Sequence, residues 1–289
     1  MSPLARAVLD WYPTAARDLP WRRPGTTPWG VLVSEFMLQQ TPVARVEPVW
    51  DEWLARWPRP SALMTASRAD VLRAWGKLGY PRRALRLHEA AAVIATAHGD
   101  VVPRDVAALE SLPGIGTYTA RAVACFGYGE RCPVVDTNVR RVVARAVHGR
   151  GDAGPARTAA DLADVDALLP ADRAPAAVVS AGLMELGAVV CTARAPRCGD
   201  CPVSGGCAWV AAGRPVYDGP RRAVQGFAGT DRQVRGLLLD VLRATDDPVH
   251  RAVLDLAWSD GAQRDRCLGS LLVDGLVDQL DDGRFALPA

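Results

Sequence analysis

Four of the seven cysteines lie within seventeen residues, and their spacing is the strongest chemical signal in the chain. They are Cys191, Cys198, Cys201 and Cys207, separated by six, two and five residues. Thiolates so close in sequence can bind zinc or hold an iron–sulfur cluster. Zinc modules usually present two C-x2-C pairs, whereas this segment has one, and its prolines and glycines let the backbone wrap a bulky cube. The spacing therefore predicts a metal site and favours a [4Fe–4S] cluster over a zinc knuckle.

A glutamate inside an apolar segment is the first candidate for acid–base chemistry. Glu35 follows Val33-Ser34 and precedes Phe36-Met37-Leu38. An ionised glutamate is costly in such surroundings unless it is paired. It is therefore either one half of a salt bridge between helices, or a general acid whose pKa is raised by burial.

A glycine hairpin and the aspartate twenty residues beyond it form the second candidate. Residues 112–116 (LPGIG) contain Gly114 and Gly116, which allow positive φ and close backbone approach. The helix expected at 117–127 would present free N–H groups that suit a phosphate. Asp136 precedes another expected helix, so it is either an ordinary N-cap or a carboxylate that stabilises a cation. Two carboxylates serve glycosidic cleavage, one protonating the leaving group and one facing the sugar cation.

The elements that position these residues are helices, because apolar periodicity punctuated by Pro and Gly predicts a mostly α fold. Before residue 208 we expect helices at 31–40, 42–57, 68–76, 82–98, 103–111, 117–127, 137–148 and 175–190. The Gly-, Pro- and Ala-rich stretch at 208–231 predicts a linker. Beyond it we expect helices at 232–244, 248–258 and 261–278, then a small hairpin at LDDGRF. That outline is typical of a winged-helix domain, and equally of a helical appendage packed on the main body.

Charge is unevenly distributed along the 289 residues. Residues 1–150 carry 20 Lys and Arg against 13 Asp and Glu, whereas residues 151–289 carry 14 against 19. The basic part suits a DNA partner, although the net charge of the chain is only +2. Lys77 is the only lysine among the 34 basic residues, which excludes mechanisms that need several lysines. No apolar run is long enough to span a membrane and no signal peptide is present, so we expect a cytoplasmic protein with reduced thiols.

Together, these motifs resemble the helix-hairpin-helix DNA glycosylases that carry an iron–sulfur loop. The resemblance covers about residues 10–210 and rests on the LPGIG hairpin, the aspartate beyond it and the four-cysteine cluster. Within that superfamily, four further segments look like the MutY-type branch, which removes adenine mispaired with 8-oxoguanine. They are LPWR (19–22), SEFMLQQT (34–41), Trp75 with LGY (78–80), and MELGA (184–188).

The resemblance implies a two-lobed, mostly α fold. Residues 22–128 would form a six-helix lobe that contains the hairpin, and residues 1–21 plus 129–215 would form the lobe with the iron–sulfur loop. Residues 216–231 would then be a linker, and residues 232–289 a small helical, winged-helix-like extension.

The resemblance also assigns roles to single residues. Glu35 matches the catalytic acid that protonates adenine N7, and Asp136 matches the carboxylate that stabilises or traps the sugar cation. Asn138 and Tyr118 match residues that assist these two carboxylates. Side chains expected to line the base pocket are Trp21, Arg22, Leu38 and Met184. Residues expected to contact DNA are Gln39, Gln40, Tyr80, Gly114 and Gly116, with Gln40 and Tyr80 wedging into the duplex.

Position 118 separates two reaction mechanisms. In the related endonuclease III enzymes a lysine matches this place and forms a Schiff base with the sugar. Here the residue is Tyr118, and the only lysine is Lys77. The resemblance therefore implies a monofunctional glycosylase in which water resolves the intermediate, with strand cleavage absent or weak.

Several positions depart from the adenine-glycosylase pattern. Pro81 stands in place of a second tyrosine, Thr137 resembles endonuclease III, and Ala181 replaces a polar side chain near the adenine edge. Only 74 residues (216–289) stand where the family usually carries a longer Nudix-like domain that reads 8-oxoguanine, and this tail either replaces that domain, adds nonspecific contacts or does neither.

The alternatives left open are a mismatch thymine or uracil glycosylase and a catalytically silent iron–sulfur DNA-binding protein. The expected partner is duplex DNA with A·8-oxoguanine or A·G mispairs, bound by a monomer at the bacterial nucleoid.

Overall fold

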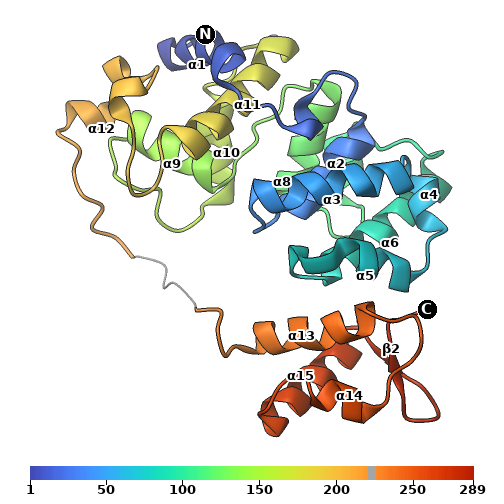
Figure 1. The fold of residues 1–289 in the computed structure, drawn as a ribbon. Helices are drawn as coiled ribbons and strands as arrows, with labels where there is room; N and C mark the ends of the chain where they lie inside the picture. Colours follow the sequence, from blue (N-terminus) through green and yellow to red (C-terminus); the bar gives the residue numbers. More distant parts are fainter. Residues whose placement is uncertain (221–225) are drawn as a thin grey trace. The chain divides into compact units, whose positions relative to one another are not determined.

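The computed structural model describes residues 1–220 and 226–289, which are mostly helical (Figure 1). They form two compact units. The first comprises Met1–Leu32, Arg104–Ser111 and Ile115–Arg222, and the second comprises Val33–Pro103, Leu112–Gly114 and Ala223–Ala289. The domain boundaries expected from the sequence stay a prediction, and residues 221–225 of the expected linker lie outside the described residues. No helix of the described chain is long and apolar enough to cross a membrane.

The first unit is built around three helices that share one apolar core. Its helices are α1 (Pro3–Ala15), α7 (Val106–Glu110), α8 (Thr117–Ala122) continued by a π-helical turn (Val123–Gly127), α9 (Thr137–Ala146), α10 (Thr158–Asp166), α11 (Arg173–Val189) and α12 (Ala208–Ala211). Helix α9 places Val139, Val142, Val143 and Ala146 on one face, at the spacing that a helix needs to bury a stripe. This stripe packs with residues of α1 and α11. Three-residue 3-10 turns lie at Pro20–Arg22, Cys198–Asp200 and Ser204–Gly206.

The second unit contains α3 (Val43–Arg56), α4 (Pro60–Met64), α5 (Arg68–Trp75), a 3-10 turn (Gly76–Leu78) and α6 (Arg82–Ala97). Helix α2 (Pro28–Leu38) begins in the first unit and ends in the second. Trp53 lies edge-on to Trp57 and Trp75, with ring centroids 4.6 and 5.7 Å away. The Trp53–Trp75 pair packs α3 against α5, and the Trp53–Trp57 pair packs the C-cap of α3 against that helix.

The LPGIG hairpin needs glycine at only one of its two positions. Gly114 has φ of +76°, and a Cβ there would lie 2.7 Å from Cβ of Arg86. Gly116 has an ordinary φ of −102° and nothing within 4 Å of an added Cβ. Close approach and positive φ, expected of both glycines, therefore hold for Gly114 alone, while Gly116 is the N-cap of α8.

The C-terminal extension, residues 226–289, forms three helices and a small hairpin within the second unit. Its elements are α13 (Asp231–Arg243), α14 (Arg251–Asp255), α15 (Gly261–Val273), β1 (Asp278–Gln279) and β2 (Phe285–Ala286). The strands are antiparallel, with Asp278 opposite Ala286, and Phe285 also bridges to Val249. The three helices and the small hairpin expected from the sequence are thus present, while the winged-helix assignment stays a prediction.

Several helix boundaries expected from the sequence were wrong. The helix expected at 261–278 ends at Val273, because Gly275 takes a left-handed φ of +64° that stops it. The helix expected at 248–258 covers only Arg251–Asp255. The expected helices did not include α1, α4 and α10, the second of which has only five residues.

Candidate active site

Asp136 stands at the start of α9 in the first unit, and both of its carboxylate oxygens accept hydrogen bonds. Oδ1 accepts from the backbone N–H of Val139 at 2.7 Å, so Asp136 is the N-cap of the helix. Oδ2 accepts from Nδ2 of Asn138, also at 2.7 Å. Burial raises the pKa of Asp136, and these two hydrogen bonds offset only part of that effect. The capping role is therefore real, and it holds the carboxylate in fixed, poorly hydrated surroundings.

Asn138 connects Asp136 to the segment that carries the first cysteine of the cluster. Oδ1 of Asn138 accepts from Nη2 of Arg141 at 2.8 Å. Arg141 also donates to the carbonyl oxygens of Gly187 at 2.6 Å and Cys191 at 2.7 Å. A Cβ on Gly187 would stand 2.7 Å from Cβ and the carbonyl oxygen of Asn138. The glycine of the MELGA segment is thus what lets α11 approach α9 beside Asn138.

Glu185, a fully buried carboxylate in α11, is held by two arginines. Arg17 donates from Nε at 2.6 Å and from Nη2 at 3.0 Å, and Arg22 donates from Nη1 at 2.8 Å. Burial alone would raise the pKa of Glu185, but the hydrogen bonds and charges of both arginines hold it below its ordinary value. Sequence reasoning missed this group, although Glu185 gives the same signal as Glu35, a glutamate in an apolar helix.

The first unit also contains the predicted site residues Trp21, Arg22, Tyr118 and Met184. Arg22, expected in the base pocket, has one guanidinium nitrogen committed to Glu185. Its neighbour Trp21 is buried, and Met184 is half-buried against the core. Tyr118 is half-buried in the first turn of α8.

Glu35 lies near the C-terminal end of α2, in the second unit, and is 6 % exposed. Its neighbours Ser34, Phe36 and Met37 are buried as well. Leu38, expected on the same helical face, is half-buried. Glu35 is therefore shielded from bulk water.

Helix α2 ends at Leu38, so Gln39 and Gln40 lie in the turn beyond it and not in a helix that continues to residue 40. Gln39 is half-buried and Gln40 is exposed. Gln40 has φ of 58° and Tyr80 has φ of 47°. Positive φ is uncommon for residues with side chains, and such strain is concentrated at functional sites. The two residues expected to wedge into DNA thus share an unusual backbone conformation.

Arg83, in the first turn of α6, connects the turns that carry Gln40 and Tyr80. Its Nη1 donates to the carbonyl oxygen of Phe36 at 2.7 Å. Its Nη2 donates to the carbonyl oxygen of Gly79 at 2.8 Å and to the hydroxyl of Thr41 at 3.1 Å. Burial lowers the pKa of Arg83 to about 10, so the guanidinium stays charged at neutral pH. The sequence did not reveal this residue, because one arginine among so many carries no signal.

The four cysteines line one hollow, which is closed by apolar side chains of α9 and α11. Burial raises the pKa of Cys201, and the nearness of the other three thiols adds to the effect. Bound iron would offset this rise in pKa, because its positive charge stabilises the thiolate form. Among the described residues, no three Cys, His, Asp or Glu side chains are placed to hold a single metal ion. The donor set fits an iron–sulfur cluster, whose irons each take one cysteine.

Arg145 organises the loop that carries these cysteines. It is 4 % exposed and donates to the carbonyl oxygens of Gly151 at 2.9 Å and Thr192 at 2.8 Å. It also donates to Sγ of Cys191 at 3.4 Å, and its guanidinium lies 4.7 Å from the ring centroid of Trp209. A buried guanidinium therefore satisfies several carbonyl groups of an irregular loop at once.

Comparisons with known proteins confirm the fold and the cluster. Residues 33–165 match the HhH-GPD superfamily of base excision DNA repair proteins, and residues 191–207 match the iron–sulfur binding domain of endonuclease III. The structure of a thermostable thymine-DNA glycosylase is 27 % identical, with a TM-score of 0.65 over 72 % of this chain and 95 % of that one.

Curated relatives identify the branch of that superfamily. The adenine DNA glycosylase of Mycobacterium tuberculosis is 66 % identical over 97 % of this chain and 92 % of that protein. The adenine DNA glycosylase of Homo sapiens is 40 % identical over 70 % of this chain and 38 % of that protein. The mycobacterial match is long enough to include nearly all of the C-terminal extension. The chain belongs to the adenine DNA glycosylases, iron–sulfur enzymes of base excision repair.

Proposed function

We propose that this glycosylase hydrolyses the N-glycosidic bond of adenine opposite 8-oxoguanine or guanine in duplex DNA, without cutting the strand. The observation that carries the proposal is the pair of contrasting carboxylates. Glu35 is 6 % exposed near the C-terminal end of α2, and Asp136, at the start of α9, has both oxygens fixed by hydrogen bonds. Two carboxylates with different surroundings are what acid-assisted glycosidic cleavage requires.

Glu35 is the proposed general acid. Protonation of adenine N7 weakens the bond to the sugar, because the departing base then leaves as a neutral molecule. Glu35 is only 6 % exposed, so a proton held on its carboxyl before reaction is shielded from bulk water.

Asp136 is the proposed partner of the sugar cation. Its orientation is set before substrate binds, because the backbone of Val139 and the side chain of Asn138 each hold one oxygen. A fixed carboxylate needs no reorganisation when positive charge develops on the sugar. Asn138 acts through Asp136, and Tyr118 assists at the start of α8.

Water, not an amine, resolves the intermediate. The only lysine, Lys77, is 82 % exposed and pairs with Asp240 of the C-terminal extension at 3.5 Å. Position 118, where endonuclease III enzymes place their lysine, holds tyrosine. No Schiff base with the sugar is therefore expected.

The target base must leave the duplex before these groups can act on it. We assign the wedge to Gln40 and Tyr80, with Gln39 beside them, and the phosphate contact of the hairpin to Gly114 and Gly116. The pocket for the extruded adenine is assigned to Trp21, Arg22, Leu38 and Met184. The [4Fe–4S] cluster, held by Cys191, Cys198, Cys201 and Cys207, would brace its loop and take no part in base release.

Four duplexes that differ in one pair test the substrate. Each carries A·8-oxoguanine, A·G, T·G or U·G, and is treated with alkali after incubation so that abasic sites appear as strand breaks. We expect breaks in the first two duplexes only, and none without alkali. Breaks confined to T·G or U·G would indicate a mismatch thymine or uracil glycosylase, and none at all would indicate a silent DNA-binding protein.

Glu35→Gln tests the acid. We expect adenine release to fall by at least about a thousandfold while duplex binding remains, because the amide cannot donate a proton at N7. Glu89→Gln is the matched control, since Glu89 is a surface carboxylate paired with Arg86. Turnover retained in Glu35→Gln would remove Glu35 from this role.

We also propose that the enzyme acts as a monomer in the bacterial cytoplasm, at the nucleoid. The bacterial source of the 66 % identical relative supports the location. Light scattering after size exclusion, with and without duplex, tests the monomer, and a dimeric mass would contradict it.

A further inference from the structure

The C-terminal extension is docked onto the turn that carries Tyr80. Arg243, in α13, donates to the carbonyl oxygen of Leu72 at 3.1 Å, and Lys77 pairs with Asp240. Beyond the turn, Arg82 pairs with Asp274 at 3.1 Å. The extension therefore holds the chain on both sides of Tyr80.

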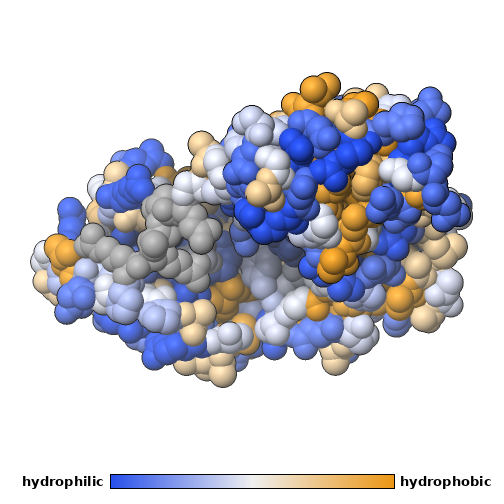
Figure 2. All heavy atoms as spheres, turned by 90° about the horizontal axis from the view of Figure 1, so that it is seen from below, coloured by the Kyte–Doolittle hydropathy of each residue, from blue (hydrophilic) through white to orange (hydrophobic). Residues whose placement is uncertain are grey.

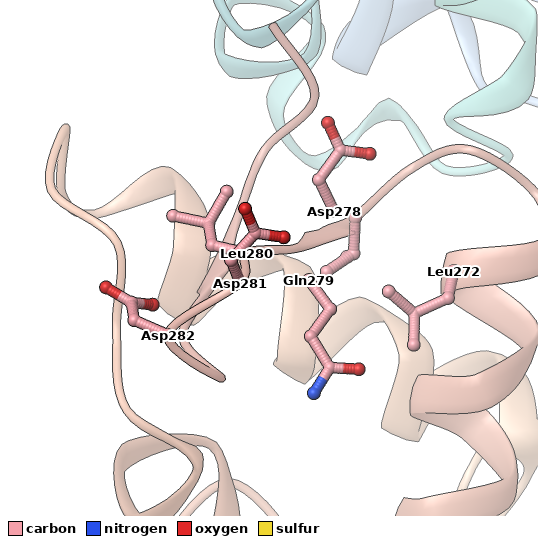
Figure 3. A pocket seen from close by; sticks show the side chains of 7 residues that line it. Leu272, Asp278, Gln279, Leu280, Asp281 and Asp282 are labelled. Atoms are coloured by element: carbon pink, nitrogen blue, oxygen red, sulfur yellow. The ribbon is translucent and has the colours of Figure 1, made fainter.

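The charges of the extension argue against DNA binding by the usual winged-helix surfaces. Residues 226–289 contain seven arginines and eleven aspartates, a net charge of −4. The hairpin lines an open pocket with Asp278, Asp281 and Asp282, whose carboxylates project from it in Figure 3. On the face shown in Figure 2, hydrophilic residues predominate and hydrophobic ones form separate small patches. The acidic hairpin would repel a phosphate backbone.

One arginine of the extension is used differently from the other six. Six of the seven form ion pairs with aspartates; they are Arg235, Arg243, Arg251, Arg264, Arg266 and Arg284. Within the described residues Arg232 has no carboxylate partner. Its neighbour Asp231 pairs with Arg266 at 2.9 Å, so that carboxylate does not neutralise Arg232.

Arg232 is instead directed at aromatic groups. Its Nη1 donates to the hydroxyl of Tyr80 at 3.0 Å, and its guanidinium lies 5.1 Å from the ring centroid of Phe227. Arg83 lies 5.6 Å from the ring centroid of Tyr80. Arg232 and Tyr80 are both exposed. The exposed guanidinium of Arg232, which pairs with no carboxylate of the described residues, thus lies beside the hydroxyl of Tyr80, the residue assigned to enter the duplex.

We propose that Arg232 binds a backbone phosphate of the duplex beside the step that Tyr80 opens, which makes the C-terminal extension part of the DNA-binding surface. This inference rests on the proposed role of Tyr80 as a wedge. A guanidinium that already donates to a phenol keeps free N–H groups for a phosphate oxygen. The extension then contributes one cationic contact at the wedge, while its acidic hairpin takes no part in DNA binding.

The test measures binding to a duplex with a tetrahydrofuran abasic analogue opposite 8-oxoguanine, which the enzyme cannot cleave. Affinity is followed by fluorescence anisotropy from about 50 to about 250 mM salt. In Arg232→Gln we expect affinity to fall roughly tenfold at low salt, and the slope of log K against log salt to flatten by about 0.9, the value for one lost phosphate contact. Arg232→Lys should restore most of the slope, because it keeps the charge.

Two further variants separate a phosphate contact from a structural effect. Tyr80→Phe removes the hydrogen bond to Arg232 but not its charge, so its salt slope should match the wild type. Arg284→Gln removes an arginine that pairs with Asp282, and should change neither slope nor affinity. An unchanged slope in Arg232→Gln would overturn the proposal, as would equal loss of affinity, without a change in slope, in both Arg232→Gln and Tyr80→Phe.

The proposed function is tested separately, by adenine release from cleavable duplexes. If the wild type releases no adenine, the proposed function fails, while the salt slopes on uncleavable DNA still decide the contact of Arg232. If adenine is released and the slope of Arg232→Gln is unchanged, only the contact fails.

Discussion

The iron–sulfur loop and the two turns that carry Gln40 and Tyr80 (the wedge turns) are both irregular, and each is organised by one arginine. Arg145 is buried and Arg83 is half-buried, and within the described residues neither pairs with a carboxylate. Arg145 donates to carbonyl oxygens and a thiol of the loop. Arg83 donates to carbonyl oxygens and a hydroxyl of the turns beside Gln40 and Tyr80. In both places the charge compensates for carbonyl groups that no helix satisfies.

The difference lies in what else holds each region. The four cysteines of the iron–sulfur loop converge on one hollow, where a cluster adds four covalent anchors. The wedge turns have no covalent anchor, and their two exposed residues are held at positive φ. We therefore expect loss of Arg145 to appear in stability and iron content, and loss of Arg83 to appear in activity.

Arg145→Met should have the largest effect. Its carbonyl partners each lose a charged donor, which costs about 1–3 kcal/mol per group. A total of at least about 3 kcal/mol would lower the melting temperature by roughly 6–12 °C. Melting followed by circular dichroism, with iron per protein measured on the same samples, checks this.

Arg150→Met is the control for that experiment, because Arg150 is an exposed arginine of the same segment. Full iron content and an unchanged melting temperature in Arg145→Met would show that the cluster alone organises the loop. Arg145 and Arg83 would then no longer differ in what each region depends on.

Arg83→Met should leave iron content unchanged and slow adenine release by roughly 10- to 100-fold under single-turnover conditions, because misplaced groups lose effective concentration. A lysine lacks the planar guanidinium that donates to both turns at once, so Arg83→Lys should restore only part of the rate. Arg86→Met, one turn further along α6, is the control. A normal rate in Arg83→Met would mean that the turns hold their conformation without it.

The sequence predicted those parts of the site that depend on local patterns. The cap of α9 by Asp136, the four converging cysteines and the helices around them all follow from spacing along the chain. These features can be recognised from short stretches of sequence, because an N-cap or a cysteine cluster is defined within a few residues.

The partners of the arginines could not be predicted in the same way. Arg83 and Arg145 look like the other arginines of the chain, and their acceptors are brought to them by tertiary packing. For the same reason the sequence extended α2 to residue 40, although the helix ends at Leu38 and Arg83 binds the groups beyond. Glu185 gave the same local signal as Glu35, and only the structure shows that Arg17 and Arg22 pair with it.

Gly187→Ala tests how tightly α11 packs against α9 beside the iron–sulfur loop. The new methyl group would stand 2.7 Å from Asn138, so α9 and α11 must separate. Overpacking of this kind costs about 1–3 kcal/mol. Gly236→Ala, where an added Cβ meets nothing within 4 Å, is the control for urea denaturation curves. Equal unfolding free energies for the two variants would show that the contact relaxes without strain.

Asn138→Ala should have the smallest effect. It tests whether the hydrogen bonds that connect Cys191 to Asp136 through Arg141 and Asn138 influence the charge of Asp136. The hydrogen bond from Asn138 lowers the pKa of Asp136, which burial already holds above its ordinary value of 3.8. Its loss should raise that pKa further, so the acid limb of the single-turnover rate should move to higher pH. The same raised pKa affects the stability of the fold. The carboxyl of Asp136 stabilises the folded state at pH values below its unfolded pKa, and this contribution is lost as the pH rises through its folded pKa. Thr137→Ala, at an exposed neighbour, should leave the limb in place. A uniform drop in rate without a shift would mean that Asn138 positions Asp136 without tuning its charge.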